Sequence, residues 1–89
     1  MAWSIELSTQ AEADLAALDR PVAQRIVRFL QERVSSLENP RTIGEPLQGA
    51  RLGALWRYRV GDYRLIASIE DAAILILIVR IGHRREVYR

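Results

Sequence analysis

The chain has 89 residues, which fits one small domain with a single core over residues 1–89, and its formal net charge is +2 at pH 7. It has no cysteine and one histidine, which excludes disulfides and thiolate sites and predicts neither a metal nor a cofactor. The charge is uneven, because residues 1–45 carry five arginines against seven acidic residues and residues 46–89 carry eight arginines against four.

The N-terminal part predicts a strand followed by a helix. Its first residues, MAWSIELSTQ, lack the basic and apolar regions of a secretory signal, so we expect a cytoplasmic protein. Apolar and polar residues alternate from Trp3 to Leu7, which predicts a short half-buried strand. Thr9 and Glu12 then have the spacing of a capping box, which predicts a helix that runs to Leu18.

A second helix is predicted directly after the first. Asp19 and Pro21 are typical of a helix start. Apolar side chains follow at helical spacing on one face and should pack on a sheet; they are Val22, Ile26, Phe29, Leu30 and Val34. The dipeptide Asn39-Pro40 ends this helix, and the glycine-rich and proline-rich stretch up to Gly53 predicts an irregular connector with a few strand residues.

Three strands are predicted in the second half, over Leu55 to Val60, Tyr63 to Ile69 and Ala73 to Ile81. The gaps between them, Gly61-Asp62 and Glu70-Asp71, have the size of hairpin turns. The last strand is apolar on both faces, as in a central strand that is covered on both sides, and it is too short to span a bilayer. The sequence therefore predicts an α+β fold, in which an N-terminal strand and two tandem helices pack on an antiparallel β meander, with no membrane partner.

Three arginines gather around the first of these turns, in the stretch RYRVGDYR. If Gly61 and Asp62 are the two central residues of a tight turn, Arg59 lies opposite Arg64, and Arg57 lies on the same face. The other face then carries the apolar side chains that belong against the helices. Like charges set opposite one another repel, so we predict that this arginine face binds an anion such as phosphate, which suits the guanidinium fork. Arginines that only contact water or nearby carboxylates are the alternative.

The C-terminal stretch GHRREVYR carries side chains that metal-free RNA cleavage needs. Such cleavage removes the proton of the ribose 2′-OH, stabilises the charge that builds on the phosphate, and neutralises the leaving 5′ oxygen. Arginines such as Arg84 and Arg85 can stabilise charge, whereas His83, Glu86 and Tyr88 are candidate proton acceptors. A basic tail that merely contacts water or a partner would have the same composition.

Taken together, LWRYRVGDYRLI and IGHRREVYR resemble the RelE family of toxin–antitoxin ribonucleases, within the RelE/ParE superfamily. The strand, helix pair, PLQG connector and meander also follow the family order, so the resemblance covers nearly the whole chain. It implies a toxin that enters the ribosomal A site and cleaves mRNA without a metal, inhibiting translation. It also implies a cognate antitoxin as partner, and contact with operator DNA only through the toxin–antitoxin complex.

By position, the resemblance assigns phosphate binding to Arg64, a catalytic role to Arg84 and a further site role to Tyr88. Arg57 and Arg59 match strand positions where the family keeps basic residues, often lysine, and this chain has no lysine. Since arginine is a poor proton acceptor, we expect Tyr88 to take the proton, with His83 as the alternative, and Arg84 to stabilise the leaving oxygen.

Two other functions fit the same family order. A ParE-like toxin shares the fold but poisons DNA gyrase and has no nuclease chemistry. A degenerate toxin that serves mainly as a co-repressor with its antitoxin is the third reading. The paired YR and the C-terminal R…Y groups favour the nuclease over the ParE-like toxin, whereas the sequence does not separate an active nuclease from a degenerate toxin.

Overall fold

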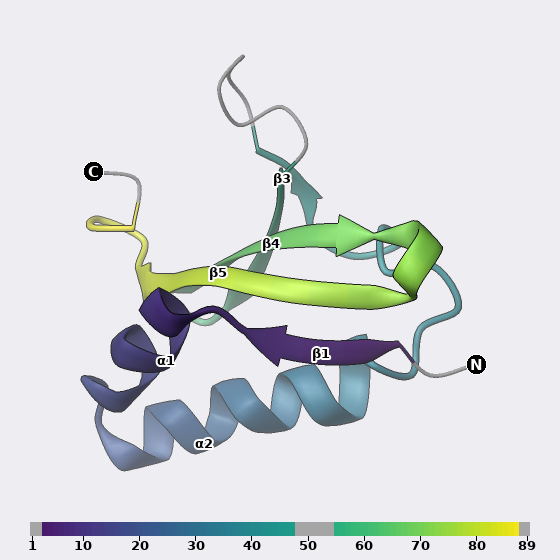
Figure 1. Cartoon of the computed structure of the whole chain (residues 1–89). Helices are drawn as coiled ribbons and strands as arrows, with labels where there is room; N and C mark the ends of the chain where they lie inside the picture. The colour runs from purple at the N-terminus through teal and green to yellow at the C-terminus, as the bar shows by residue number, and fades with distance from the viewer. Residues whose placement is uncertain (1–2, 48–54, 88–89) are drawn as a thin grey trace.

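The computed structural model of the protein describes residues 3–47 and 55–87. Two helices cover one face of a five-stranded sheet whose strand order is β1-β5-β4-β3-β2 (Figure 1). The elements are β1 (Ser4–Leu7), α1 (Thr9–Ala16), α2 (Arg20–Arg28), the π-helical η1 (Phe29–Val34), β2 (Glu45–Pro46), β3 (Leu55–Val60), β4 (Tyr63–Glu70), the 3-10 turn η3 (Asp71–Ala73) and β5 (Leu75–His83).

The predicted α+β architecture is confirmed, and the sheet is mixed rather than purely antiparallel. Strands β3, β4 and β5 form the expected antiparallel meander, and the short β2 extends it beyond β3. Strand β1 lies on the other side of β5 and runs parallel to it. In Figure 1 both helices lie below the sheet, whereas the segment after β5 rises above it. No helix of the described residues is long and apolar enough to cross a membrane.

Helix α1 begins one residue earlier than the predicted capping box. Its N-cap is Ser8, not Thr9, and the Ser8 hydroxyl accepts a hydrogen bond from the Ala11 N–H at 3.0 Å. The same hydroxyl donates to the Val79 carbonyl at 2.9 Å, and the Ser8 N–H donates to Ile78. Ser8 therefore continues the pairing of β1 along β5, and this long-range contact decides which hydroxyl caps the helix.

The apolar stripe of the second helix is confirmed as core. Ile26, Leu30 and Val34 are buried, and Val22 and Phe29 pack beside them. Opposite this stripe the sheet contributes buried side chains from three strands, namely Tyr58, Val60, Leu65, Ala67, Ile76, Ile78 and Ile81. The sidedness predicted for the β3–β4 hairpin is therefore correct on its apolar face.

A β-bulge in β5 keeps these side chains on the same face. Ile66 pairs with Arg80 and Ala67 pairs with Ile78, so Val79 has no partner of its own on β4. Without the extra residue, strict alternation would turn Ile81 away from the helices. The bulge instead returns Ile81 to the core.

The connection between β4 and β5 is longer than the two-residue gap that the sequence predicts. The turn η3 and Ile74 occupy it, and Ile74 takes a left-handed conformation with φ 50°. Asp71 receives two hydrogen bonds from Arg41, at 3.0 and 2.9 Å, which lower the pKa of Asp71. This ion pair joins the connector after the helices to the far end of the meander.

Candidate active site

The β3–β4 turn, Gly61-Asp62, organises the candidate site. Val60 pairs with Tyr63 across it, and Arg59 pairs with Arg64, which is the register expected from the sequence. Gly61 has φ 60°, and a positive φ at the first central position is typical of the type II′ turns that suit the twist of hairpins. The glycine therefore fixes which side chains of the two strands face one another.

Arg64 is the buried cation of this site, with 8% of its surface exposed. Its Nη1 donates to the backbone carbonyls of Gly61, at 3.0 Å, and Tyr63, at 3.1 Å. No carboxylate of the described residues forms an ion pair with it. A buried charge normally requires a counter-charge, so the turn carbonyls hold a guanidinium whose charge an incoming anion can balance.

The segment after β5 is joined to the same turn. The Arg84 N–H donates to the Asp62 carbonyl at 2.8 Å, and the Arg84 Nε lies 3.9 Å from an Asp62 carboxylate oxygen. Farther along, the N–H groups of Glu86 and Val87 both donate to the His83 carbonyl, at 2.8 and 3.0 Å. The chain thus folds back on itself immediately after the strand.

This fold-back brings Val87 against Gly82, the residue that pairs with Arg64 across the strands. Arg64 pairs directly with Gly82 of β5, so the two residues share a face of the sheet. A Cβ on Gly82 would lie 3.3 Å from the Val87 Cβ, and Val87 is only 6% exposed. The missing side chain at Gly82 therefore makes room for Val87 on the face of the sheet that also carries Arg64.

His83 is also fixed in place. It lies opposite Tyr63, and the two rings contact edge to face with centroids 5.7 Å apart. Its Nδ1 accepts a hydrogen bond from the Arg85 N–H at 3.2 Å. The neutral imidazole then carries its proton on Nε2, so it presents a donor rather than an acceptor on its outer side.

A hollow of about 400 Å³ lies beside these groups, between the end of α1 and the segment after β5. Tyr63, His83 and Glu86 line it together with Asp14 and Arg80. Sequence reasoning assigned Tyr63 to the apolar face of the hairpin and did not place it next to His83, because that contact depends on the register between β4 and β5. The sequence carries no turn signal that fixes this register.

Asp14 anchors α1 to the strand next to this hollow. Its carboxylate accepts hydrogen bonds from the Ile81 N–H at 2.9 Å, the Arg80 Nε at 3.1 Å and the Gln10 amide at 2.8 Å. Burial alone would raise the pKa of Asp14, but these hydrogen bonds outweigh it and hold the pKa below its ordinary value. Asp14 is therefore an ionised structural group at the edge of the site.

The predicted site residues do not all come together. Arg64, Arg84 and His83 meet at the β3–β4 turn and the end of β5, and the Arg85 side chain is exposed nearby. Arg57 instead forms an ion pair with Glu45 of β2. Tyr88 lies outside the described residues.

Arg59 also departs from the single arginine face that the sequence predicts. It is exposed at the edge of the sheet and, although paired with Arg64 in register, lines a hollow next to α2. Strand pairing fixes only the directions of the Cβ atoms, and the long arginine side chains diverge beyond them. Within the part of the chain that the structure describes, no group of three His, Cys, Asp or Glu side chains could hold a metal ion.

Comparison with known proteins places the chain among bacterial toxins. A family model described as the ParE toxin of the type II toxin–antitoxin system parDE matches residues 5–88. The toxin RelG of Mycobacterium tuberculosis is 30% identical over 89 residues, covering 100% of this chain and 99% of the relative. The toxin RelE of the same organism is 31% identical over 87 residues, covering 98% of this chain and 87% of the relative.

Solved structures agree with this placement. The chain matches the toxin–antitoxin complex RelBE2 of Mycobacterium tuberculosis with a TM-score of 0.85 and 28% identity, over 97% of this chain and 95% of that chain. The isolated RelE toxin of E. coli, at 17% identity and a TM-score of 0.70, shares the fold.

Proposed function

Because the chain belongs to the RelE/ParE superfamily of type II toxins, we propose that it is a ribosome-dependent endoribonuclease that cleaves mRNA and thereby inhibits translation. In the proposed reaction the ribose 2′-OH attacks the adjacent phosphorus and the 5′ oxygen of the next nucleotide leaves, without a metal ion. The observation that carries this proposal is Arg64, a buried arginine with no carboxylate partner among the described residues.

Arg64 and Arg84 supply the charge that this reaction requires. The attack adds negative charge to the phosphate, and fixed donors aimed at that charge lower the barrier because they need no reorganisation during the reaction. Hydrogen bonds to the turn carbonyls of Gly61 and Tyr63 fix the Arg64 guanidinium in this way. Arg84 is tethered to the same turn through Asp62, and we assign it the stabilisation of the leaving oxygen.

The remaining roles follow from the chemistry of the side chains. Tyr88, acting as a phenolate, is the proposed acceptor of the 2′-OH proton, and His83 is the alternative. Arg57, Arg59 and Arg85 are the proposed contacts to RNA outside the reacting phosphate. We propose the ribosome and mRNA as the partners of this surface in the cytoplasm.

A cognate antitoxin is the other proposed partner. Several of the similar solved structures are toxin–antitoxin complexes, among them the M. tuberculosis RelBE2 complex. An antitoxin that covers the Arg64 region would keep the toxin inactive, and operator DNA would be contacted only through the complex.

Primer extension on an mRNA under translation by purified ribosomes tests the nuclease. The wild-type protein should produce new 5′ ends, whereas Arg64→Gln and Arg84→Gln should each lower single-turnover cleavage by about 10²-fold or more, the usual loss for one charge-stabilising donor. Arg20→Gln, which changes an exposed arginine at the start of α2, is the matched control and should cleave normally. Thermal unfolding of each variant checks that loss of cleavage is not loss of fold.

The alternative is a ParE-like inhibitor of DNA gyrase, and the matching family model is the observation that favours it. Such a toxin acts by binding and needs no arranged phosphate site. Two results together would replace the nuclease proposal with gyrase inhibition. The wild-type protein would inhibit supercoiling by gyrase, and it would leave translated mRNA intact.

A further inference from the structure

A second basic surface lies on the other side of the β3–β4 turn from Arg64. It is an open groove between the α2–η1 helix and the edge of β3, with a volume of about 340 Å³, and we call it the α2 groove. Four arginines, one carboxylate and one aromatic ring are among the side chains that line it, namely Arg25, Arg28, Arg33, Arg59, Glu32 and Phe29. A smaller hollow of about 210 Å³ shares Phe29, Arg33 and Arg59 and continues along β3.

The positive charge of the α2 groove is mostly uncompensated. Arg28 forms an ion pair with Glu32 at 3.6 Å. The uncompensated charges are therefore those of Arg25, Arg33 and Arg59. None of these three forms an ion pair with a carboxylate of residues 3–47 or 55–87, and all three are exposed. Three like charges around one small groove repel one another, so a bound polyanion is favoured there.

The groove is also open at the sheet edge. Strand β2 pairs only with Trp56 and Arg57 of β3, so within the described residues no strand covers the stretch that holds Arg59. A ligand can therefore reach the groove from the side of the sheet. Phe29, which packs edge to face on Tyr58 with centroids 6.2 Å apart, gives the groove an apolar floor.

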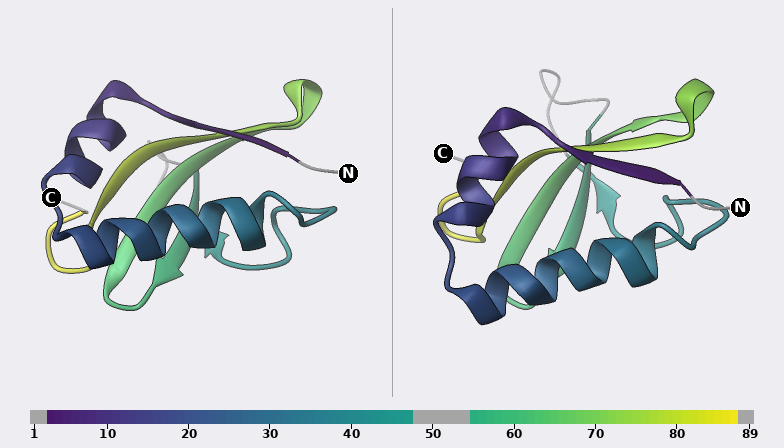
Figure 2. Two further views of the ribbon diagram at one scale, coloured as in Figure 1. Left: turned by 90° about the horizontal axis from the view of Figure 1, so that it is seen from below. Right: turned by 60° about the horizontal axis from the view of Figure 1, so that its bottom comes forward.

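Only the two-residue turn separates the α2 groove from the candidate active site. The Arg25 Nη1 lies 3.1 Å from the position that a Cβ on Gly61 would occupy. On its other side the same turn accepts hydrogen bonds from Arg64, at the Gly61 carbonyl, and from Arg84, at the Asp62 carbonyl. Figure 2 shows this turn passing beside α2 in both views.

We propose that the α2 groove binds the phosphodiester backbone of the RNA strand that continues from the phosphate at Arg64. This inference rests on the proposed nuclease function and extends its substrate contacts onto the helix layer. Guanidinium groups pair with phosphate through two parallel hydrogen bonds, and they pair with carboxylates equally well. Continuity across Gly61 favours RNA over an acidic protein segment, because this glycine adjoins the Arg25 guanidinium and also accepts a hydrogen bond from Arg64.

The test measures the binding of a fluorescent single-stranded RNA at several salt concentrations. Each phosphate neutralised on a single strand contributes a slope of about −0.7 in log affinity against log salt. Arg25→Gln, Arg33→Gln and Arg59→Gln should therefore each flatten the slope by roughly 0.7, and the triple variant by roughly 2. Thermal unfolding should be nearly unchanged, since the three side chains are exposed.

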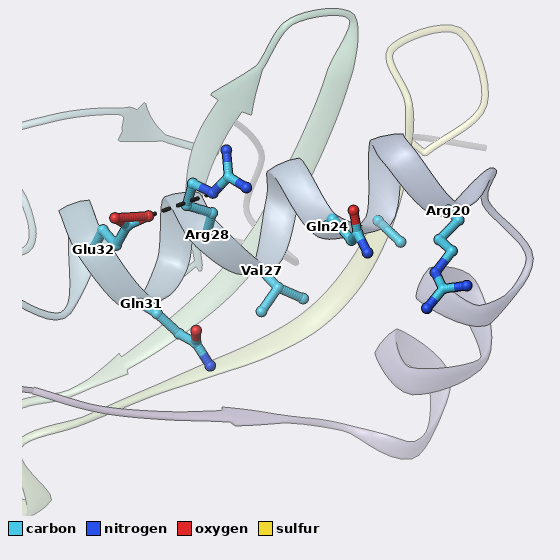
Figure 3. Close-up of a pocket in the computed structure, with 7 residues that line it drawn as sticks. Arg20, Gln24, Val27, Arg28, Gln31 and Glu32 are labelled. Carbon is cyan, nitrogen blue, oxygen red and sulfur yellow. Dashed lines mark ion pairs between the residues drawn. The ribbon is translucent and has the colours of Figure 1, made fainter.

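Arg20→Gln is the matched control. Arg20 belongs to the same helix, is exposed and has no ion pair among the described residues, but it lies outside the groove. Figure 3 shows it at the opposite end of the outer helix face from the Arg28–Glu32 pair. This variant should keep the wild-type slope, which separates a local site from a general loss of charge.

The outcomes separate the groove from the nuclease. An unchanged slope in the triple variant overturns the groove, whatever the protein cleaves. A flattened slope in a protein that never cleaves mRNA supports the groove as an RNA site while the nuclease function fails. A triple variant that binds RNA like the wild type but no longer binds its antitoxin would overturn the RNA assignment and identify the ligand as an acidic protein segment.

Discussion

The backbone N–H of Arg84 donates to the backbone carbonyl of Asp62 at 2.8 Å, whereas their side chains lie 3.9 Å apart and are half or more exposed. The position of Arg84 beside the β3–β4 turn therefore depends on a main-chain contact that a ligand need not break. An exposed ion pair at that distance stabilises little, so the guanidinium can leave Asp62 for a phosphate at small cost.

Gly82 should be sensitive to any side chain, because its Cβ would meet Val87 at 3.3 Å. We predict that Gly82→Val displaces the segment after β5 and slows mRNA cleavage by about 10-fold or more, since small shifts of positioned groups are costly in catalysis. Gly82→Ala should have a smaller effect. Single-turnover cleavage and thermal unfolding are the measurements.

The matched test adds Val87→Gly to Gly82→Val, which removes the opposing Cβ at 3.3 Å and should restore part of the cleavage. If the double variant is no better than Gly82→Val alone, the steric explanation is wrong. Full activity in Gly82→Val would show that the packing of Val87 against Gly82 is not needed for the reaction.

Local sequence signals predicted the parts of the site that depend on short-range chemistry. Gly61-Asp62 is a turn signal with a defined length, and it gave the Arg59–Arg64 register correctly. The neighbours of Tyr63 on β5 and the partner of Arg57 depend on contacts between distant segments, where no such signal exists. Ser8 shows the same limit, since its pairing with β5 rather than the capping-box spacing of Thr9 sets the helix start.

The arginine face shows why side-chain positions are harder to predict than strand register. The alternation of a strand places Arg57, Arg59 and Arg64 on one face, and the register confirms it. Arg57 stays on that face and pairs with Glu45, its cross-strand neighbour on β2. The longer reach of an arginine side chain takes the Arg64 guanidinium to the turn carbonyls and lets Arg59 line a hollow next to α2.

Asp14 should be important for stability because it is the acceptor that joins α1 to β5. Asp14→Ala leaves the Ile81 N–H and Arg80 without this acceptor, and we expect the free energy of unfolding to fall by about 1–3 kcal/mol. Asp14→Asn should cost less because it keeps one oxygen. Glu38→Ala, which removes an exposed carboxylate with no ion pair among the described residues, is the control and should change little.

The same carboxylate should make the protein sensitive to acid. The pKa of Asp14 is lowered in the folded state. Its contribution to the stability of the fold is therefore present above the unfolded-state pKa of about 3.9 and is lost as pH falls through the folded-state pKa. Urea unfolding at pH 7 and near pH 3 should therefore show a smaller acid loss for Asp14→Ala than for the wild type. An equal loss in both proteins would contradict this assignment.

Tyr58 should cause a loss of stability at alkaline pH. Its buried hydroxyl donates to the Pro40 carbonyl at 2.6 Å, and burial raises the pKa of Tyr58 to about 12. The contribution of the protonated Tyr58 hydroxyl to the free energy of unfolding is complete below the unfolded-state pKa of about 10. It is lost as pH rises towards the folded-state pKa. Tyr58→Phe should lower stability at pH 7 by about 1–3 kcal/mol and show less loss between pH 10 and 12.

Tyr63→Phe is the matched control for that comparison, because no hydrogen bond of the Tyr63 hydroxyl is found among the described residues. Urea unfolding of the three proteins at pH 7, 10 and 11 is the measurement. If Tyr58→Phe and the wild type lose the same amount of stability at alkaline pH, other groups cause that loss.

The proton acceptor of the proposed reaction can be identified by comparing Tyr88 with His83. His83 Nδ1 already accepts the Arg85 N–H at 3.2 Å, so a neutral His83 offers its Nε2–H outwards and is poorly arranged to take a proton. Tyr88→Phe keeps the ring and removes the hydroxyl. It should leave ribosome binding nearly intact while slowing single-turnover mRNA cleavage by about 10²-fold or more, the scale of a lost general base. His83→Gln should slow cleavage much less. The reverse ranking would make His83 the proton acceptor. A fully active Tyr88→Phe variant would leave the tyrosine with a packing or stacking role alone.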